Sequence, residues 1–374
     1  MTRLFVDIHV LQTVPPSNLN RDDTGSPKSA FYGGVRRARV SSQAWKRSTR
    51  AAFAQRLDKI DLGVRTKRSV ELIADLLEAD HGLAREDALA RATAALKVVD
   101  IKPKVGRAQK GATEPPVVQT DYLIFFSRRQ LERVAGVAAI SANPSKKDVT
   151  EALDREHGIE VALFGRMVAD NKELSVDASV QVAHAISTHA VVDESDYFTA
   201  VDDVTQAEGE ETGAGMLGTV EFNSATFYRY ATVNVEGLHS NLGDATATAR
   251  AAAAFVGDFV SSMPTGKQNT FANRTTADAV VVMLRTDQPV NLVGAFEQAV
   301  VGGRGEGRVA ESAARLADQA RAVRAFVAEP AHSFVVVAGS SCEPLTSVGE
   351  SMSMAVLCAR VESAVSAHLD TSQP

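Results

Sequence analysis

The sequence predicts an α+β protein built on a ferredoxin-like sheet that is interrupted by insertions. Two observations lead to this prediction: short strand-like runs stand near the N-terminus and in the last third of the chain, and helical patterns separate them. Strands and helices in the order β-α-β-β-α-β are typical of such a sheet. A chain of 374 residues is long for one compact core, so we expect one large or two modest domains.

The first segment predicts a strand that ends in a turn-rich loop. Residues 4–10 place Leu4, Val6 and Ile8 on one face, which is the alternation of a half-buried strand. The Pro, Ser and Asn residues of 15–20 favour a turn. We therefore expect the strand to end at this turn.

A second strand and a helix follow, and they carry the densest polar chemistry of the chain. Residues 35–40 predict a short strand on which Arg37 and Arg39 share a face. The serines that come next supply an N-cap, and the pattern predicts a helix over residues 43–57.

Two insertions are predicted between this unit and the last third. Residues 60–160 are helical in pattern and rich in Ala, Leu and Glu, and a Gly/Pro/Lys stretch over 101–116 breaks them as a loop. Further on, strand-like runs at 197–201 and 219–222 flank the polar segment 206–218. Two strands around a polar tip indicate a protruding hairpin.

The last third alternates strands and helices, which completes the predicted sheet. The expected elements are a strand over 226–235, a helix over 246–263, a strand over 279–284, a helix over 311–328, a strand over 334–338 and a helix over 350–368.

Composition places the chain among ordinary globular proteins. Hydrophobic residues make up 45% and charged residues 23%, which excludes a wholly disordered or fibrous chain. Apolar stretches are too short to span a bilayer, and the N-terminal residues do not resemble a secretory signal. Two cysteines in so long a chain indicate a reducing compartment. We expect a cytoplasmic protein.

The charge of the chain is unevenly distributed. The formal net charge is −6, yet residues 28–68 contain twelve Lys or Arg against two Asp, a local net charge of +10. A phosphate backbone responds to the face that it meets rather than to the whole protein. The segment is therefore a candidate nucleic-acid surface.

Within this segment, the start of the predicted helix suits a phosphate. Free backbone N–H groups point out of a helix start, and Gln43, Lys46 and Arg50 follow along one stripe of the helix. Trp45 lies on another stripe that can pack inward. A solvated basic helix with an ordinary serine cap is an equally good interpretation of these residues.

Other candidates are weaker. Residues 227–230 place two aromatic rings on one strand face, where bases could stack, although such rings more often pack against a helix. His184 and His189 miss the spacing of a helical zinc pair, so core or capping roles are favoured. Asp22 and Asp23 could in principle bind a metal ion, but a loop role is favoured. No metal site and no cofactor is predicted.

Several blocks of the sequence, in order along most of the chain, resemble one known family. They are Ile8-His9-Val10-Leu11, Leu19-Asn20-Arg21-Asp22-Asp23, Gly33-Gly34-Val35-Arg36-Arg37-Ala38-Arg39-Val40-Ser41-Ser42-Gln43, Gly165-Arg166-Met167, residues 183–189, residues 198–203 and Phe227-Tyr228-Arg229-Tyr230. Together they resemble the CasC-type backbone subunit of the type I-E CRISPR surveillance complex, Cascade.

The resemblance implies a hand-like fold. Its palm is of RNA-recognition-motif type, its fingers are an inserted helical segment, and its thumb is a β-hairpin. Transferred to this chain, the palm comprises residues 1–58, 181–194 and 223–374, the fingers 59–180 and the thumb 195–222.

The resemblance also implies a non-catalytic role in antiviral defence. Several copies stack head to tail along a CRISPR RNA and present it for pairing with target DNA, beside the large, small, guide-end-capping and RNA-processing subunits. The RNA-binding residues that it implies are Arg21, Lys28, Ser41, Ser42, Gln43, Lys46, Arg50, Arg166, Met167, Phe198, Thr199 and Val201, and we add Arg37 from its strand.

Two other functions stay open at the level of sequence. Related backbone subunits cut RNA with a loop aspartate, and Asp22 or Asp23 could be interpreted in that way. A monomeric ribonucleoprotein-like RNA-binding protein is the other alternative. For Met167, a core position at a helix end is the alternative to an RNA contact.

Overall fold

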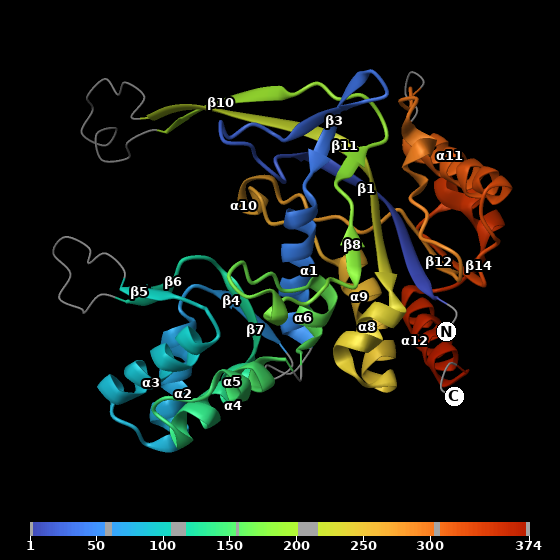
Figure 1. Ribbon diagram of the computed structural model, residues 1–374. Helices are drawn as coiled ribbons and strands as arrows, with labels where there is room; N and C mark the ends of the chain where they lie inside the picture. Colours follow the sequence, from blue (N-terminus) through green and yellow to red (C-terminus); the bar gives the residue numbers. More distant parts are fainter. Residues whose placement is uncertain are drawn as a thin grey trace, which may run out of the picture. The chain divides into compact units, whose positions relative to one another are not determined.

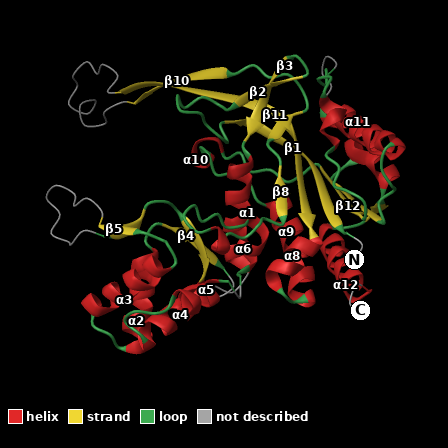
Figure 2. Cartoon of the chain, viewed as in Figure 1, coloured by secondary structure: helices red, strands yellow, loops and turns green. Residues whose placement is uncertain are grey.

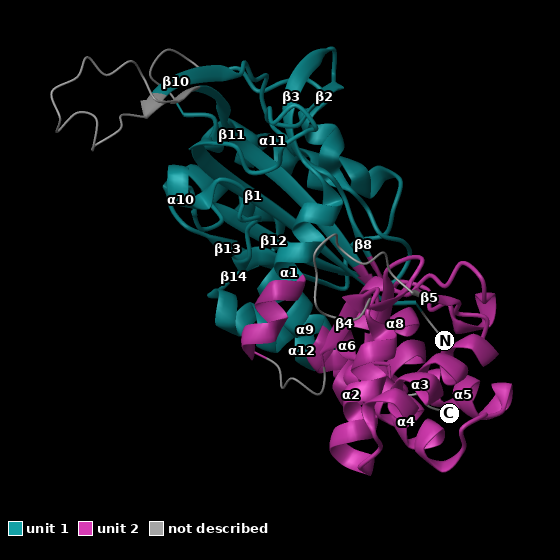
Figure 3. Cartoon of the chain, turned by 90° about the vertical axis from the view of Figure 1, so that its left-hand side faces the viewer, with its two compact units in different colours: residues 1–49, 181–232, 252–364 teal, residues 50–180, 233–251, 365–374 magenta. Residues whose placement is uncertain are grey.

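The computed structural model describes residues 3–56, 62–105, 117–154, 157–200, 216–302 and 307–371. The described residues form a mixed α+β fold with one large sheet (Figure 1). The chain divides into two compact units, coloured separately in Figure 3. Unit 1 comprises residues 1–49, 181–232 and 252–364, and unit 2 comprises residues 50–180, 233–251 and 365–374.

Unit 1 contains most of a ten-stranded sheet, in the order β14-β13-β12-β1-β11-β9-β3-β2, with β8 and β10 also paired to β11. Its strands are β1 (Phe5–Ser17), β2 (Ser29–Tyr32), β3 (Val35–Val40), β8 (Val180–Val182), β9 (Ala185–Ser187), β10 (Glu194–Ala200), β11 (Met216–Asn234), β12 (Ala279–Arg285), β13 (His332–Val337) and β14 (Glu350–Ser351).

The centre of this sheet is covered on both faces. β1 and β12 pair antiparallel, with Phe5 opposite Arg285 and Leu11 opposite Ala279, and every residue of β12 is buried. This burial explains why the strand is an unbroken apolar run rather than an alternating one, since a strand covered on both sides has no solvent face.

Two sets of helices cover the two faces (Figure 2). On one face, Tyr228 and Tyr230 share a core with helix α11 (Val309–Ala322) and the 3₁₀ segments η3 (Leu292–Phe296) and η5 (Ser340–Val348). On the other face, the Arg229 guanidinium lies 3.7 Å from the ring centroid of Trp45 in α1 (Ser42–Arg56) and donates to the Phe259 carbonyl of α9 (Ala245–Ser261). The predicted stacking face at 227–230 is therefore buried, and its packing alternative is confirmed.

The remaining described elements of unit 1 are short or peripheral. They are α10 (Gln268–Phe271), η4 (Val323–Ala325) and the first part of α12 (Met354–Thr371).

Unit 2 is mainly helical and has its own core. Its elements are α2 (Ser69–His81), α3 (Arg85–Val98), α4 (Arg128–Ile140), α5 (Lys146–Leu153), α6 (Ile159–Phe164), η2 (Lys172–Leu174), α8 (Val235–Leu242) and the strand pairs β4 (Gly63–Thr66) with β7 (Ile124–Ser127) and β5 (Pro103–Val105) with β6 (Val118–Thr120). The core contains Ile73, Leu77, Leu96, Phe126 and Leu131, all buried.

Several predicted elements are confirmed within one or two residues, and others need correction. The helix expected over 43–57 is α1, and the strand expected over 279–284 is β12. β1 runs on to Ser17, so the turn predicted from residue 15 is wrong. The helix expected from residue 350 begins at Met354, because the preceding residues form β14.

Candidate nucleic-acid interface

The loop before β2 is fixed to its surroundings by two asparagines. The backbone carbonyl of Asn20 accepts the Lys28 N–H at 2.8 Å, and its side-chain Oδ1 accepts the Ser41 N–H at 2.8 Å. The buried Asn18 amide donates to the carbonyls of Gly25 and Glu221, at 2.9 Å each. The loop that bears Arg21 and Lys28 is thereby held against the start of α1 and against β11.

The start of α1 has the cap that the sequence predicts. Ser41 is buried, and its Oγ accepts the Ala44 N–H at 3.3 Å, so the hydroxyl caps the helix. Ser42 is half-buried and Gln43 is exposed. Lys46 follows one turn later, and partial burial lowers the pKa of its ammonium group.

The opposite stripe of α1 packs inward, as predicted. Trp45, Thr49 and Phe53 are buried, and the Trp45 ring meets Phe259 edge to face at 6.5 Å between centroids. This packing fixes the rotation of the helix, so its polar stripe is the one that remains accessible.

Part of the positive charge of residues 28–68 is neutralised within the chain. The ion pairs are Arg36–Asp193, Arg50–Glu160 and Arg68–Glu71. Arg50, in unit 2, donates from Nε to Glu160 at 2.8 Å and lies over the Phe125 ring at 4.3 Å. Its guanidinium therefore already has a carboxylate and a ring as partners, and its phosphate contact stays a prediction.

The RNA contact predicted for Arg37 is corrected, because this side chain is fully buried. Its guanidinium donates to the carbonyls of Tyr32, Ser187, Phe296 and Glu297 at 2.8 to 3.2 Å. The four carbonyls accept from Nε, Nη1 and Nη2 of the guanidinium. The side chain therefore links β2 and β9 to η3 and is not accessible to RNA.

Arg166 and Met167 separate into different roles. Arg166 is buried in unit 2, stacks on Phe126 and donates to the carbonyls of Leu174 and Leu153. Its predicted RNA contact is corrected for this reason. Met167 is 79% exposed, so the core alternative for this methionine is wrong, and Arg166 acts as the anchor of the segment that presents it.

The predicted hairpin is present as a two-stranded ribbon that extends from the sheet (Figure 1). β10 pairs antiparallel with the first part of β11, with Phe198 opposite Gly218 and Thr199 opposite Leu217. Phe198 is 39% exposed, and a Cβ atom on Gly218 would come within 2.4 Å of its ring. Val201 lies outside the described residues.

Of the two acidic candidates, Asp22 stabilises the loop. Asp22 Oδ1 accepts the backbone N–H groups of Thr24 and Ser26 and the Thr24 hydroxyl, and the hydroxyl is the main cause that lowers the pKa of Asp22. Asp23 is exposed. Within the described ranges, no group of three or more His, Cys, Asp and Glu side chains could hold a metal ion.

The sequence did not indicate how the loop that bears Arg21 and Lys28 is held in place, nor that His184 is exposed beside Arg39. The roles of Asn18 and Asn20 depend on contacts to Glu221 and Ser41. His184, expected in the core or at a cap, is exposed, and its Nδ1 lies 3.1 Å from Nη1 of Arg39. The conspicuous alternation of Arg37 and Arg39 was the available signal, but it could not indicate which arginine stays accessible.

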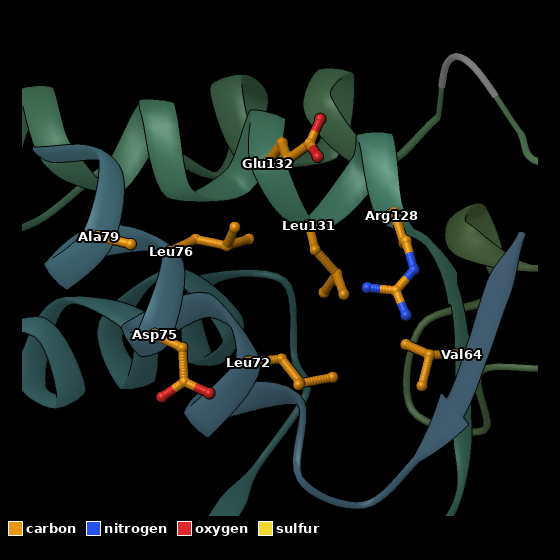
Figure 4. A pocket seen from close by; sticks show the side chains of 8 residues that line it. All are labelled: Val64, Leu72, Asp75, Leu76, Ala79, Arg128, Leu131 and Glu132. Atoms are coloured by element: carbon orange, nitrogen blue, oxygen red, sulfur yellow. The ribbon is translucent and has the colours of Figure 1, made fainter. Parts of the chain in front are cut away.

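Unit 2 contains a pocket of a different character between α2, α4 and β4 (Figure 4). Val64, Leu72, Leu76, Ala79 and Leu131 form its apolar lining, and Asp75, Arg128 and Glu132 complete it; its volume is about 310 Å³. Its mixed charge does not favour a phosphate. No helix of the described residues is long and apolar enough to cross a membrane.

Comparisons with known proteins identify the family. A search of curated protein sequences found no match to this chain. Among solved structures, a chain of a "CRISPR RNA-guided surveillance complex, pre-nicking" is 34% identical, with a TM-score of 0.83 over 96% of this chain and 100% of that chain. A chain of a "CRISPR RNA-guided surveillance complex" is 30% identical, with a TM-score of 0.71 over 96% and 99%. Because the family model described as CT1975-like protein also matches residues 6–359, this chain belongs to the CT1975-like family of Cas proteins.

Proposed function

We propose that this chain is a non-catalytic backbone subunit of a CRISPR RNA-guided surveillance complex. It binds the guide RNA in several head-to-tail copies, beside large, small, guide-end-capping and RNA-processing subunits, and presents the guide for pairing with target DNA. The observation that carries the proposal is its likeness, over almost the whole length of both chains, to subunits of solved surveillance complexes.

The fold supports the proposal. β1, α1, β9, β11, α9 and β12 follow one another in the order β-α-β-β-α-β, and their strands are neighbours in the sheet as β12-β1-β11-β9. This is the succession of a ferredoxin-like, RNA-recognition-motif palm. We assign unit 2 mainly to the fingers and the ribbon of β10 and β11 to the thumb.

The accessible side chains among the predicted contacts define the proposed RNA contacts. In unit 1 they are Arg21, Lys28, Ser42, Gln43, Lys46 and Phe198, and in unit 2 Met167. Ser41 contributes indirectly, since its hydroxyl caps α1 and its backbone N–H is bonded to Asn20, which together hold the helix start in place. Contacts to phosphate lack sequence information, so one subunit can hold any guide while base pairing selects the target.

The assembly of complexes on RNA tests this function. The purified chain is mixed with RNAs of increasing length, and the mass of each complex is measured by native mass spectrometry. We expect the number of bound copies to rise in steps with RNA length. A constant single copy on every RNA would support the monomeric RNA-binding alternative instead.

The same complexes test the cleavage alternative. Assembled on a guide RNA, they are incubated with complementary RNA and Mg²⁺, and the products are resolved by length. We expect intact RNA, because Oδ1 of Asp22 accepts three hydrogen bonds within its loop and the described residues hold no cluster of acidic side chains for a metal ion. Regularly spaced cuts that disappear in an Asp22→Asn or Asp23→Asn variant would establish the nuclease.

A further inference from the structure

Three basic side chains from separate segments of unit 1 gather beside the edge of the large sheet. Arg39 lies in β3, His184 directly precedes β9, and Lys28 directly precedes β2. β3 pairs with both neighbours: Arg39 is opposite Ile186 of β9, and its backbone N–H donates to the Lys28 carbonyl at 2.9 Å. The strand register therefore brings the three side chains into one cluster.

Arg39 is held in place by two of its own hydrogen bonds. Its Nε donates to the Ser29 carbonyl at 3.2 Å, and its Nη1 donates to Nδ1 of His184 at 3.1 Å. A guanidinium has no acceptor, so Nδ1 of His184 is the acceptor and the proton of the neutral ring is on Nε2. The remaining N–H groups of the guanidinium and the imidazole Nε2–H are available to a ligand.

The electrostatics of this cluster favour an anion. His184 is exposed, and its pKa lies below the ordinary value because of partial burial and the nearby charges of Arg39 and Lys28. Within the described ranges, these two cations are the charged groups that act on the ring. A phosphate oxygen would accept charge-assisted hydrogen bonds from the same donors and reduce the repulsion between them.

We propose that Arg39, His184 and Lys28 together bind one backbone phosphate of RNA, and that His184 takes up a proton when the phosphate binds. This inference rests on the proposed RNA-binding function and adds to it a phosphate site and a dependence on pH.

The proton uptake follows from linkage between the two equilibria. In the free chain, partial burial and the two cations hold the His184 pKa low. A proton taken up by His184 binds Nδ1 in place of the hydrogen bond from Arg39. A bound phosphate that accepts from both side chains stabilises the imidazolium and raises that pKa. Between the two values, the complex binds more protons than the free protein, so affinity for RNA rises as the pH falls.

Binding of a labelled single-stranded RNA, measured by fluorescence anisotropy at low salt between about pH 8 and pH 5.5, tests the site. For the unmodified chain, we expect the Kd to fall with pH by at most about tenfold per pH unit, the limit for one proton. His184→Gln should weaken this pH dependence, because glutamine retains hydrogen-bonding groups but does not titrate. Arg39→Gln should weaken binding at every pH and lower the salt slope by about 0.7, the value for one phosphate contact of a single strand.

His332→Gln is the matched control. His332 is also exposed and lies on the same sheet, in β13, which β12, β1 and β11 separate from β9. This variant should keep the affinity and pH dependence of the unmodified chain. Thermal unfolding of each variant checks folding, and if Arg39→Gln does not fold, Arg39→Lys and the exposed His184→Gln carry the test.

The outcomes separate this inference from the function on which it rests. If the unmodified chain binds RNA at no pH, the proposed RNA-binding function fails. If it binds RNA, but His184→Gln retains the full pH dependence and the arginine variants retain the affinity, the phosphate site is overturned while the function stands.

Discussion

Arg37 shows how a basic residue beside a nucleic-acid surface can serve the fold alone. Its four carbonyl acceptors come from β2, from β9 and from residues 296 and 297 at the end of η3. At the same place Gly33 has a φ of +59°, and a Cβ atom there would overlap the Glu297 carbonyl. The guanidinium and the glycine together let the β2–β3 hairpin lie directly against η3.

Replacing this arginine should destabilise the protein strongly. Arg37→Met leaves buried carbonyls without donors, and we expect the free energy of unfolding to fall by at least about 3 kcal/mol. Urea unfolding of the free chain measures the change. Arg47→Met, at an exposed position of α1, is the control and should shift it by no more than about 0.5 kcal/mol. Equal unfolding midpoints for the two variants would contradict this structural role of Arg37.

Met167 gives the opposite prediction. Because its side chain is 79% exposed, Met167→Ala should change the free energy of unfolding by no more than about 0.5 kcal/mol. We expect the same variant to loosen nuclease protection of bound RNA at regular positions, since a flexible thioether can pack against a displaced base. The buried Met263 is a control, and its replacement by Ala should cost about 2 kcal/mol or more. An unaltered footprint would remove Met167 from the interface.

At the scale of elements, the ribbon of β10 and β11 depends on a glycine. Gly218 leaves the space that the Phe198 ring occupies across the strand pair. An aromatic ring over a cross-strand glycine covers backbone that would otherwise be bare. The placement of this predicted RNA contact is thus set by a residue that itself offers no side chain.

Gly218→Val should therefore displace the Phe198 ring. A Cβ atom at residue 218 would lie 2.4 Å from Cζ of Phe198, so the ring must turn away. We expect fewer bound copies per RNA in native mass spectra, with little change in the melting temperature of the free chain because Phe198 is only partly buried. Thr219→Val is the control, because it places the same valine at an exposed neighbouring position. This variant should assemble normally. Normal assembly of Gly218→Val as well would argue against a role for the ring.

Elements whose signals are local could be predicted from the sequence, whereas the partners of single side chains could not. The start of α1 depends on Ser41 and the inward stripe on Trp45, a few residues apart. Arg37 is buried by η3, about 260 positions away, and Arg50 is paired with Glu160, 110 positions away. Alternation along a strand assigns a residue to a face but does not say what covers that face.

At the scale of the whole molecule, buried neutral groups couple stability to pH. His189 Nε2 accepts the Thr226 N–H at 3.1 Å, and Nδ1 bonds the Ala190 carbonyl at 2.9 Å. Burial, aided by Arg308 and Arg37, lowers the His189 pKa to about 4. The unfolded chain therefore binds more protons between about pH 6.5 and pH 4, so this stability is present above pH 6.5 and is lost as the pH falls.

His189→Gln should reduce this loss. Glutamine can accept from one backbone group and donate to another without titrating. Urea unfolding at about pH 7 and pH 5 should show the variant losing roughly 2 kcal/mol less than the unmodified chain. Asp7, whose pKa burial raises to about 6, acts in the opposite direction in both proteins and cancels in the comparison. Identical losses would exclude His189 as a source of the pH dependence.

β11 joins two environments within one continuous strand of 19 residues. Residues 216–222 pair with β10 in the ribbon, whereas residues 225–233 are buried in the central sheet. Local opening is easy where little apolar surface is covered and approaches global unfolding in a core. Amide hydrogen exchange should therefore slow by orders of magnitude along this single strand. Because β11 is continuous, a force applied to the ribbon would be transmitted along its backbone into the buried part of the sheet.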